Sequence, residues 1–380
     1  MTLLRSTAPA TSDAIRLLSA IGDAFGNHAA GFALRVARVA ARFAVHRGCD
    51  HEMVAATYFA AALHEIGLIR VVVPPGTSER ERTIALWDAP AQGATIADGI
   101  GGLPHATGDY IRWHRESFDG TGFPDRLRWN GIPHASMAIN VARAFVEAIE
   151  AQGEDASPPE AMFALVGEAG RAYAVNVIRE FREFYSALGA DFDAAFDPAW
   201  PLDRLDPKTL VTGICAEIDA RDERTLGRGE RLEALTLAIA EKLEGMPLES
   251  EAARFAARLV SLGRIRREGT SDDFDPLARL GREARAAEAI SAAHLLEHAP
   301  AFAAYGTIVG ASAEWFDGSG LPRHLSADGI DPIARVLAFA IAAEAMGPAL
   351  QAPLRLQAAA GTQFDPAVVR AYLATTGGQR

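Results

Sequence analysis

A seven-residue phrase containing two glycines and a proline occurs twice, and it constrains the fold more than any other feature. It reads Phe-Asp-Gly-Thr-Gly-Phe-Pro at residues 118–124 and Phe-Asp-Gly-Ser-Gly-Leu-Pro at residues 316–322. The motif positions are Asp119, Gly120, Gly122, Phe123 and Pro124 in the first copy, and Asp317, Gly318, Gly320, Leu321 and Pro322 in the second. So many glycines and prolines predict an irregular loop, in which the aspartates cap a turn and the glycines take positive φ.

Two further landmarks recur in the same order at nearly constant spacing. Residues 63–69 (Leu-His-Glu-Ile-Gly-Leu-Ile) correspond to residues 259–265 (Leu-Val-Ser-Leu-Gly-Arg-Ile), and residues 32–37 correspond to residues 228–233. Three landmarks in one order indicate tandem copies of a single domain. We predict domains at residues 1–196 and 208–380, joined by a proline-rich linker at residues 197–207 that disfavours helix.

Hydrophobic spacing predicts helices throughout both copies. Phe32, Val36, Val39 and Phe43 recur at the period of an amphipathic helix, whereas strand-like alternation is nearly absent. The predicted fold class is therefore all-α, with two helical bundles in tandem.

Charge and cysteine content limit the partners and the compartment. Asp and Glu outnumber Lys and Arg by 49 to 37, which gives a net charge of −12 and disfavours a nucleic-acid surface. The two cysteines, Cys49 and Cys215, lie in different copies, so neither copy has an internal disulfide. No stretch approaches the roughly 20 apolar residues of a membrane helix, so we expect a cytoplasmic protein without a membrane partner.

The order of these landmarks resembles that of the HD-GYP domain. That family has an early helix, then His-Asp-Ile-Gly, then His-His-Glu-x-x-Asp-Gly-x-Gly-Tyr-Pro; here residues 64–67 read His-Glu-Ile-Gly and the two loops follow the last pattern closely. The chain resembles two such domains in tandem, over nearly its whole length. The resemblance implies an all-helical HD-superfamily fold. In active members, two or three iron or manganese ions activate water and hydrolyse cyclic di-GMP.

The resemblance also indicates which metal ligands the first copy keeps. His64 stands at the family's first histidine, Glu65 replaces the neighbouring aspartate, and His114 matches the first histidine of the His-His pair. The early-helix histidine position is Phe32, but His28 lies one turn earlier, where members often have a glutamate. These side chains are candidates for one weakly held divalent ion, iron or manganese, rather than for a dinuclear centre.

Two arginines stand where the family has ligands. Arg115 occupies the second position of the His-His pair, and Arg143 aligns with the closing aspartate. A guanidinium stays charged and would oppose a metal cation. Both arginines are instead candidates for binding a phosphate group, although pairing with nearby carboxylates is the simpler interpretation.

In the second copy the ligand positions hold other residue types. Val260 and Ser261 replace His-Asp, Ser312 replaces the first histidine of the pair, and Ile341 replaces the closing aspartate. We therefore expect no metal chemistry in this copy.

Three hypotheses about function follow from these substitutions. The first is a catalytically degenerate HD-GYP-like regulatory or interaction module in bacterial cyclic-dinucleotide signalling, with a protein partner such as a diguanylate-cyclase-type protein. The second is a residual metal-dependent phosphodiesterase that uses the first copy. The third is a nucleotide sensor in which Arg115 and Arg143 contact phosphate. The sequence leaves the ligand and the oligomeric state open.

Overall fold

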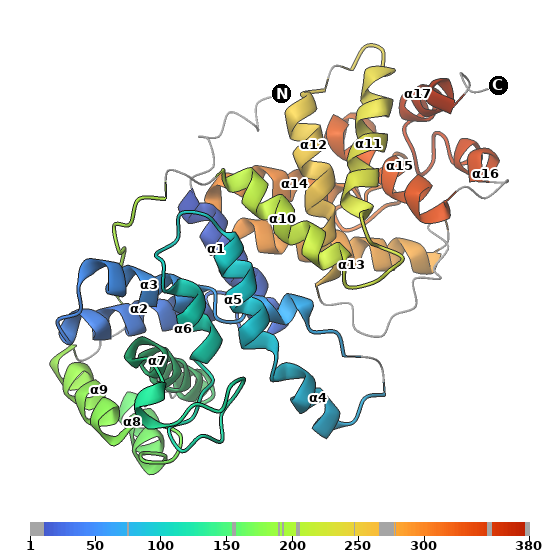
Figure 1. Ribbon diagram of the computed structural model, residues 1–380. Coiled ribbons are helices and arrows are strands. Elements are labelled where there is room, and N and C mark those ends of the chain that lie inside the picture. The colour runs from blue at the N-terminus through green and yellow to red at the C-terminus, as the bar shows by residue number, and fades with distance from the viewer. Residues whose placement is uncertain are drawn as a thin grey trace. The chain divides into compact units, whose positions relative to one another are not determined.

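The computed structural model describes residues 11–73, 76–153, 157–188, 191, 194–202, 206–246, 248–265, 277, 279–347 and 352–376. The described residues contain helices and loops but no β-strand, which confirms the all-α prediction (Figure 1). The chain divides into two compact units, one of Ile15–Asp206 and the other of Pro207–Arg380 together with residues 11–14. None of the helices in the described ranges is long and apolar enough to cross a bilayer.

The first unit begins within α1. Its helices are α1 (Thr11–Phe25), α2 (Phe32–His46), α3 (His51–Ala62), α4 (Glu79–Leu86), α5 (Ala89–Gly99), α6 (Thr107–Trp113), α7 (His134–Glu150), α8 (Pro158–Gly167) and α9 (Val175–Leu188), with 3-10 turns η1 (Ile66–Arg70) and η2 (Trp129–Gly131). The predicted apolar stripe of the early helix is buried along α2.

Apart from α4 and η6, the described residues of the second unit repeat this order of elements. Its helices are α10 (Pro207–Asp219), α11 (Arg228–Glu241), α12 (Ser250–Leu259), α13 (Arg279–Glu297), α14 (Ala303–Ala311), α15 (Pro332–Met346), α16 (Ala352–Ala358) and α17 (Pro366–Thr376), with 3-10 turns η5 (Val260–Arg264), η6 (Pro300–Phe302) and η7 (Ala327–Gly329). Thus α2 corresponds to α11, α6 to α14 and α7 to α15.

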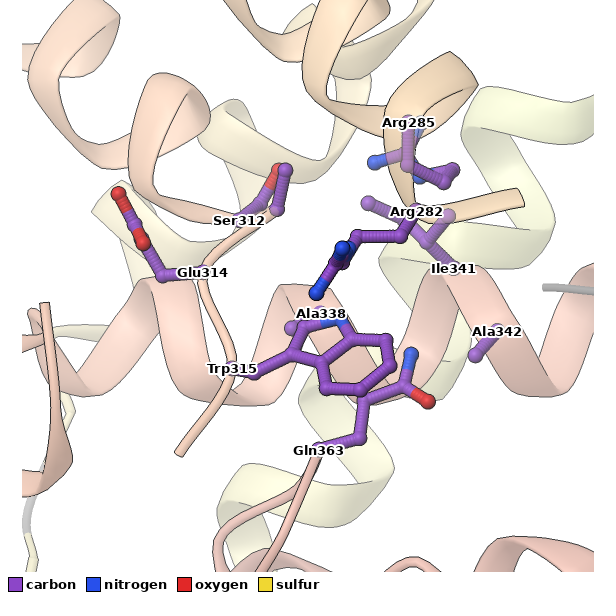
Figure 2. Close-up of a pocket in the computed structure, with 10 residues that line it drawn as sticks. Arg282, Arg285, Ser312, Glu314, Trp315, Ala338, Ile341, Ala342 and Gln363 are labelled. Atoms are coloured by element: carbon purple, nitrogen blue, oxygen red, sulfur yellow. The ribbon is translucent and has the colours of Figure 1, made fainter. Parts of the chain in front are cut away.

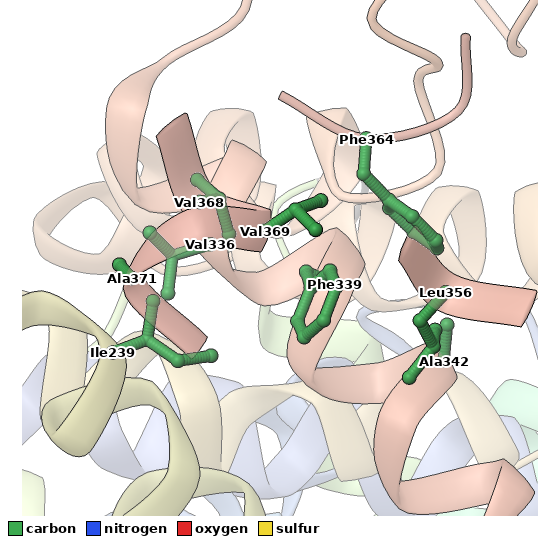
Figure 3. Close-up of a cluster of buried hydrophobic side chains, with 9 residues drawn as sticks. All are labelled: Ile239, Val336, Phe339, Ala342, Leu356, Phe364, Val368, Val369 and Ala371. Atoms are coloured by element: carbon green, nitrogen blue, oxygen red, sulfur yellow. The ribbon is translucent and has the colours of Figure 1, made fainter. Parts of the chain in front are cut away.

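Equivalent helices build the two cores. In the first unit, Phe181 of α9 packs edge-on against Phe43 of α2 and Phe145 of α7, with ring centroids 5.2 and 5.4 Å away. In the second unit, Phe339 of α15 packs against Phe364, 5.1 Å away, beside Ile239 of α11 (Figure 3). Each core is a cluster of interlocked aromatic and aliphatic side chains, whose burial from water is the main stabilising term.

The start of the predicted linker docks on the first unit. The indole of Trp200 donates to the carbonyl of Gly102 at 3.0 Å, and Phe196 packs against the cluster that includes Ala41 and Val54. Residues 203–205 of the predicted linker lie outside the described residues. The domain limits at 196 and 208 therefore stay a prediction, whereas the contacts divide the chain at Asp206.

The two Asp-Gly-x-Gly-x-Pro loops have one conformation. As predicted, Asp119 and Asp317 each accept a hydrogen bond from the backbone two residues on, at 2.9 and 2.8 Å. Only the first glycine of each loop takes positive φ, +81° at Gly120 and +84° at Gly318. The expectation of positive φ is therefore wrong for the second glycines, which are needed for another reason described below.

The second glycine of each loop lies against the backbone of the preceding segment. A Cβ at Gly122 would lie 2.1 Å from the backbone nitrogen of Ser117, and one at Gly320 would lie 2.0 Å from that of Trp315. Any side chain would collide with the main chain, so these positions require glycine for space.

Candidate functional site

The first unit brings its candidate residues together. His64 lies in the turn after α3, Glu65 leads into η1, and His114 and Arg115 follow α6. His28 lies in the loop before α2 and stacks on Phe32 with ring centroids 3.9 Å apart. The rings of His64 and His114 meet edge to face, with centroids 5.2 Å apart.

Both buried histidines use the same nitrogen to fix their orientation. Nδ1 of His64 lies 2.7 Å from the Ala61 carbonyl, and Nδ1 of His114 lies 2.6 Å from the Ile111 carbonyl. A carbonyl accepts, so Nδ1 carries the proton in each ring and leaves Nε2 with a lone pair in the neutral form. Neither Nε2 has a hydrogen-bond partner among the described residues. Burial lowers the pKa of His114 well below its ordinary value, helped by the charges of His64 and Arg115, so this ring stays neutral.

Arg115 forms an ion pair with the carboxylate that lies beside these rings. Its Nη2 donates to Oε1 of Glu65 at 2.9 Å, and the same Oε1 lies 3.3 Å from Nε2 of His64. Burial would raise the pKa of Glu65, but the adjacent His64 side chain and the Arg115 cation hold it well below its ordinary value. Glu65 is therefore an ionised, nearly inaccessible carboxylate whose counter-charge is a guanidinium.

Arg143 lies near this cluster but forms its own ion pair. Its Nη1 donates to Oε2 of Glu147, one turn along α7, at 2.5 Å. Burial and the neighbouring Arg115 cation lower the pKa of Arg143 from its ordinary value. Two arginines thus face one small region, and each has a carboxylate partner, as the simpler interpretation of the sequence predicts.

The residues present do not fit the metal centre that the family resemblance implies. Within the part of the chain that the structure describes, no group of three or more His, Cys, Asp or Glu side chains is arranged to hold an ion. A divalent cation on Glu65 would have to displace a guanidinium that cannot lose its proton. Two imidazole lone pairs remain, and they fall short of the three or four ligands that hold a transition metal firmly.

Two acidic residues that the sequence analysis missed organise this region. Asp23 of α1 accepts from the backbone nitrogens of Gly31 and Ala33 at 2.8 and 2.9 Å and so fixes the start of α2. Burial raises its pKa to about 6, against the effect of these two hydrogen bonds. In the second copy, Asp219 accepts from Gly229 at 2.7 Å. Recurrence of the aspartate at the repeat spacing was the available signal.

The second missed residue is the buried Glu116, which holds the first loop. Its two carboxylate oxygens accept from the backbone nitrogens of Asp125 and Leu127 at 2.7 and 3.0 Å. Glu314 does the same for Arg323 and Leu325 at 2.7 and 3.2 Å. Each glutamate stands three residues before the motif aspartate, so its repetition could also have been read from the sequence.

The second unit has a different ion pair at its equivalent site. Arg228, at the place of Phe32, is 5% exposed and lies 3.2 Å from Oε2 of Glu344 on α15. Arg231 contacts the other oxygen of Glu344 at 2.7 Å. Here also an arginine at a position where the family resemblance places a metal ligand is paired with a glutamate.

Comparison with known proteins supports a shared fold. The model of the HD domain family matches residues 15–177 and 215–368. Among solved structures, the chain is similar to a cyclic GMP-AMP specific phosphodiesterase of V. cholerae (V-cGAP3), with a TM-score of 0.69 and 16% sequence identity over 98% of each chain. No curated protein matches the sequence significantly.

Proposed function

This chain belongs to the HD domain family, and on that premise we propose that it is a catalytically degenerate member acting as a regulatory or interaction module in cyclic-dinucleotide signalling. The observation that carries the proposal is the 2.9 Å contact between Arg115 and Glu65. The carboxylate at the position of the family's aspartate is bound by a cation that belongs to the chain itself.

Electrostatics explains why this pair opposes metal binding. Glu65 is 5% exposed, so its interaction with Arg115 is weakly screened by water. A divalent ion would meet the fixed charge of Arg115 at close range and would find Glu65 already satisfied. Hydrolysis of a phosphodiester at neutral pH needs a metal-activated water or an equivalent base. Neutral His114 alone does not supply the charge stabilisation that the leaving oxygen needs.

The preserved loops support an interaction role. Both Asp-Gly-x-Gly-x-Pro loops keep their backbone geometry and their buried glutamates, although the ligand positions around them have changed. The need to maintain the fold explains part of this preservation of the loops. A binding surface for a signalling protein of the diguanylate-cyclase type accounts for the rest, and the similarity to a cyclic GMP-AMP phosphodiesterase favours a cyclic-dinucleotide context.

Metal content and hydrolysis together test the proposal. We would measure iron, manganese and zinc in anaerobically purified protein, and then assay hydrolysis of cyclic di-GMP and cyclic GMP-AMP with added Mn²⁺ or Fe²⁺. The expected result is far less than one equivalent of metal and no turnover. In Arg115→Gln, manganese affinity should rise at least about tenfold, because the competing cation is gone. The matched control is Arg171→Gln, which removes an exposed arginine paired with Glu168.

The opposite outcome would establish an enzyme. One or more equivalents of metal that disappear in the His64→Ala/His114→Ala double variant, together with turnover of either dinucleotide, would overturn the degenerate assignment. Equal manganese affinity in wild type and Arg115→Gln would show that Arg115 is not what opposes the ion.

A metal-dependent phosphohydrolase is the second candidate, and one observation favours it. His64 and His114 are oriented through Nδ1 by backbone carbonyls, as metal-binding histidines commonly are. If Arg115 swung away, His64, His114 and Glu65 would be three possible ligands. The double variant above separates this candidate from the first.

A nucleotide sensor is the third candidate, and Arg143 is its basis. Nε of Arg143 is buried and has no hydrogen-bond partner among the described residues. Because Arg115 and Arg143 both have carboxylate partners, a phosphate would have to displace Glu65 or Glu147. We therefore rank this candidate below the other two.

A further inference from the structure

A small pocket lies in the second unit at the place that corresponds to the first unit's histidine cluster. Its lining includes Arg282 and Arg285 from α13, Ser312 and Trp315 after α14, Ile341 from α15, and Gln363 (Figure 2). Ser312 corresponds to His114, and Ile341 corresponds to Arg143. The pocket therefore occupies the position in the second copy that the histidine cluster occupies in the first.

Side-chain size explains why a cavity is present here. Ser312 and Ala313 stand where the first copy has His114 and Arg115, so an imidazole and a guanidinium are replaced by a hydroxymethyl and a methyl group. The cavity has a volume of about 20 Å³, which is room for about one water. The hydroxyl of Ser312 donates to the carbonyl of Val309 at 2.7 Å and leaves its oxygen lone pairs as the polar contribution.

Arg282 gives the pocket its charge. Its Cζ lies 5.4 Å from the centre of the Trp315 ring, and its Nη1 donates to the carbonyl of Ser319 at 2.9 Å. Figure 2 shows the guanidinium of Arg282 beside the indole. The Nε of Arg282 is buried and has no acceptor among the described residues. A buried donor without an acceptor is costly, and an oxyanion in the pocket would remove that cost.

The carboxylates of the neighbourhood are engaged elsewhere. Glu314 also lines the pocket, but both its oxygens accept backbone hydrogen bonds from the following loop, and Figure 2 shows it on the side away from Arg282. Glu288 forms an ion pair with Arg285. The side of the pocket near α13 thus presents positive charge and N–H donors, next to the apolar faces of Ala338 and Ile341.

We propose that this pocket binds the phosphoryl group of a small ligand, with Arg282 as the principal contact and Arg285 in support. Arginine donors suit the several oxygens of a phosphate. Because the cavity has room for about one water, phosphoryl oxygens enter it while the rest of the ligand stays at the mouth. The proposal concerns the second unit only and does not depend on whether the first unit is catalytic.

Calorimetric titration of the full chain at low salt tests the proposal. The probes are inorganic phosphate, guanosine monophosphate and guanosine without phosphate. The variants are Arg282→Gln, Arg282→Lys and the control Arg254→Gln, which removes an equal charge from an arginine that is 52% exposed on α12. Removing the Arg282 contact should weaken phosphate binding about tenfold to a hundredfold, and lysine should recover part of it. Far-UV circular dichroism confirms that each variant is folded.

The outcomes distinguish a free oxyanion from a nucleotide phosphate as the ligand, and they also show whether the proposal is wrong. Equal affinity for phosphate and the monophosphate indicates a free oxyanion site. Tighter binding of the monophosphate, with no binding of guanosine, indicates a nucleotide phosphate. Absence of binding by either phosphate, or the same loss in Arg254→Gln as in Arg282→Gln, would overturn the proposal.

Discussion

At the scale of single residues, arginine substitutions define both sites. Arg115 takes the carboxylate of Glu65 in the first unit, and Arg228 takes that of Glu344 in the second. Arg115 stands at a ligand position of the family, and Arg228 stands at the place of Phe32, which is the early-helix histidine position. The sequence predicted that Arg115 pairs with a nearby carboxylate, but it could not show which glutamate each arginine contacts, because side-chain direction depends on how the helices pack. The Glu344 partner in particular lies on a helix more than a hundred residues away.

Replacing Arg115 should show how much its ion pair with Glu65 contributes to the free energy of unfolding. In Arg115→Gln the buried Glu65 loses its counter-charge, so we expect the free energy of unfolding to fall by about 1–3 kcal/mol at pH 7. The folded pKa of Glu65 is depressed, so the pair's contribution is present at neutral pH and is lost as the pH falls through that depressed pKa. Urea unfolding at pH 7 and at a pH below that depressed pKa should therefore show the two proteins converging in acid. The exposed Arg171→Gln control should change stability by less than about 0.5 kcal/mol, and an equal effect would contradict the prediction.

Asp23 should give the stability of the chain an opposite pH dependence. Its pKa is raised to about 6, so its protonated form favours the folded state at low pH, and that contribution is lost as the pH rises through 6. In Asp23→Asn this component is absent. The stability of the variant relative to wild type should therefore be higher at pH 7 than at pH 4.5, by about 2 kcal/mol. Unfolding curves at the two pH values measure this difference, and a constant difference would refute it.

At the scale of elements, the two loops show how much of a local structure can be predicted. Two glycines and a proline predicted irregular loops, and the capping aspartates were predicted with them. The second glycines were assigned positive φ wrongly, because a glycine needed for backbone torsion and one needed for space look identical in a sequence. Gly122 and Gly320 are needed because Ser117 and Trp315 pass too close for any Cβ.

Alanine substitutions should separate these two reasons for glycine. Gly122→Ala and Gly320→Ala force a Cβ to within about 2 Å of backbone nitrogen, so each should lower stability by several kcal/mol. Gly99, at the end of α5, is the control, because no described atom lies within 4 Å of its Cβ position. Gly99→Ala should be neutral or stabilise by up to about 1 kcal/mol. Thermal melting of the three variants tests the contrast, and equal melting temperatures would show that the loops can yield.

At the scale of the whole molecule, the repeat was the most reliable information in the sequence. Its spacing predicted two bundles of the same helix order, and the structure confirms an all-α chain with that order in both units. The clustering of His28, His64, Glu65 and His114 also followed from the motif order. The pocket beside Arg282 could not be predicted, because the family pattern assigns no role to that part of α13, and its charge depends on where the side chain points.

Cutting the chain between Asp206 and Pro207 tests the division into units. Each has its own aromatic core, so fragments 1–206 and 207–380 should each show helical circular dichroism and a sigmoidal urea transition. A fragment that stays unfolded alone but folds when mixed with the other would show that the two cores are not independent.

The arginine–glutamate pairs also affect how the protein depends on its surroundings. A metal-bound cluster must be loaded after synthesis, and iron in particular varies with nutrient supply and with oxidation. Arg115 and Arg228 are translated with the chain, so their charges are present in every copy from the moment it folds. The two ion pairs they form should therefore be the same in iron-starved and iron-replete cells, and the same before and after exposure to air.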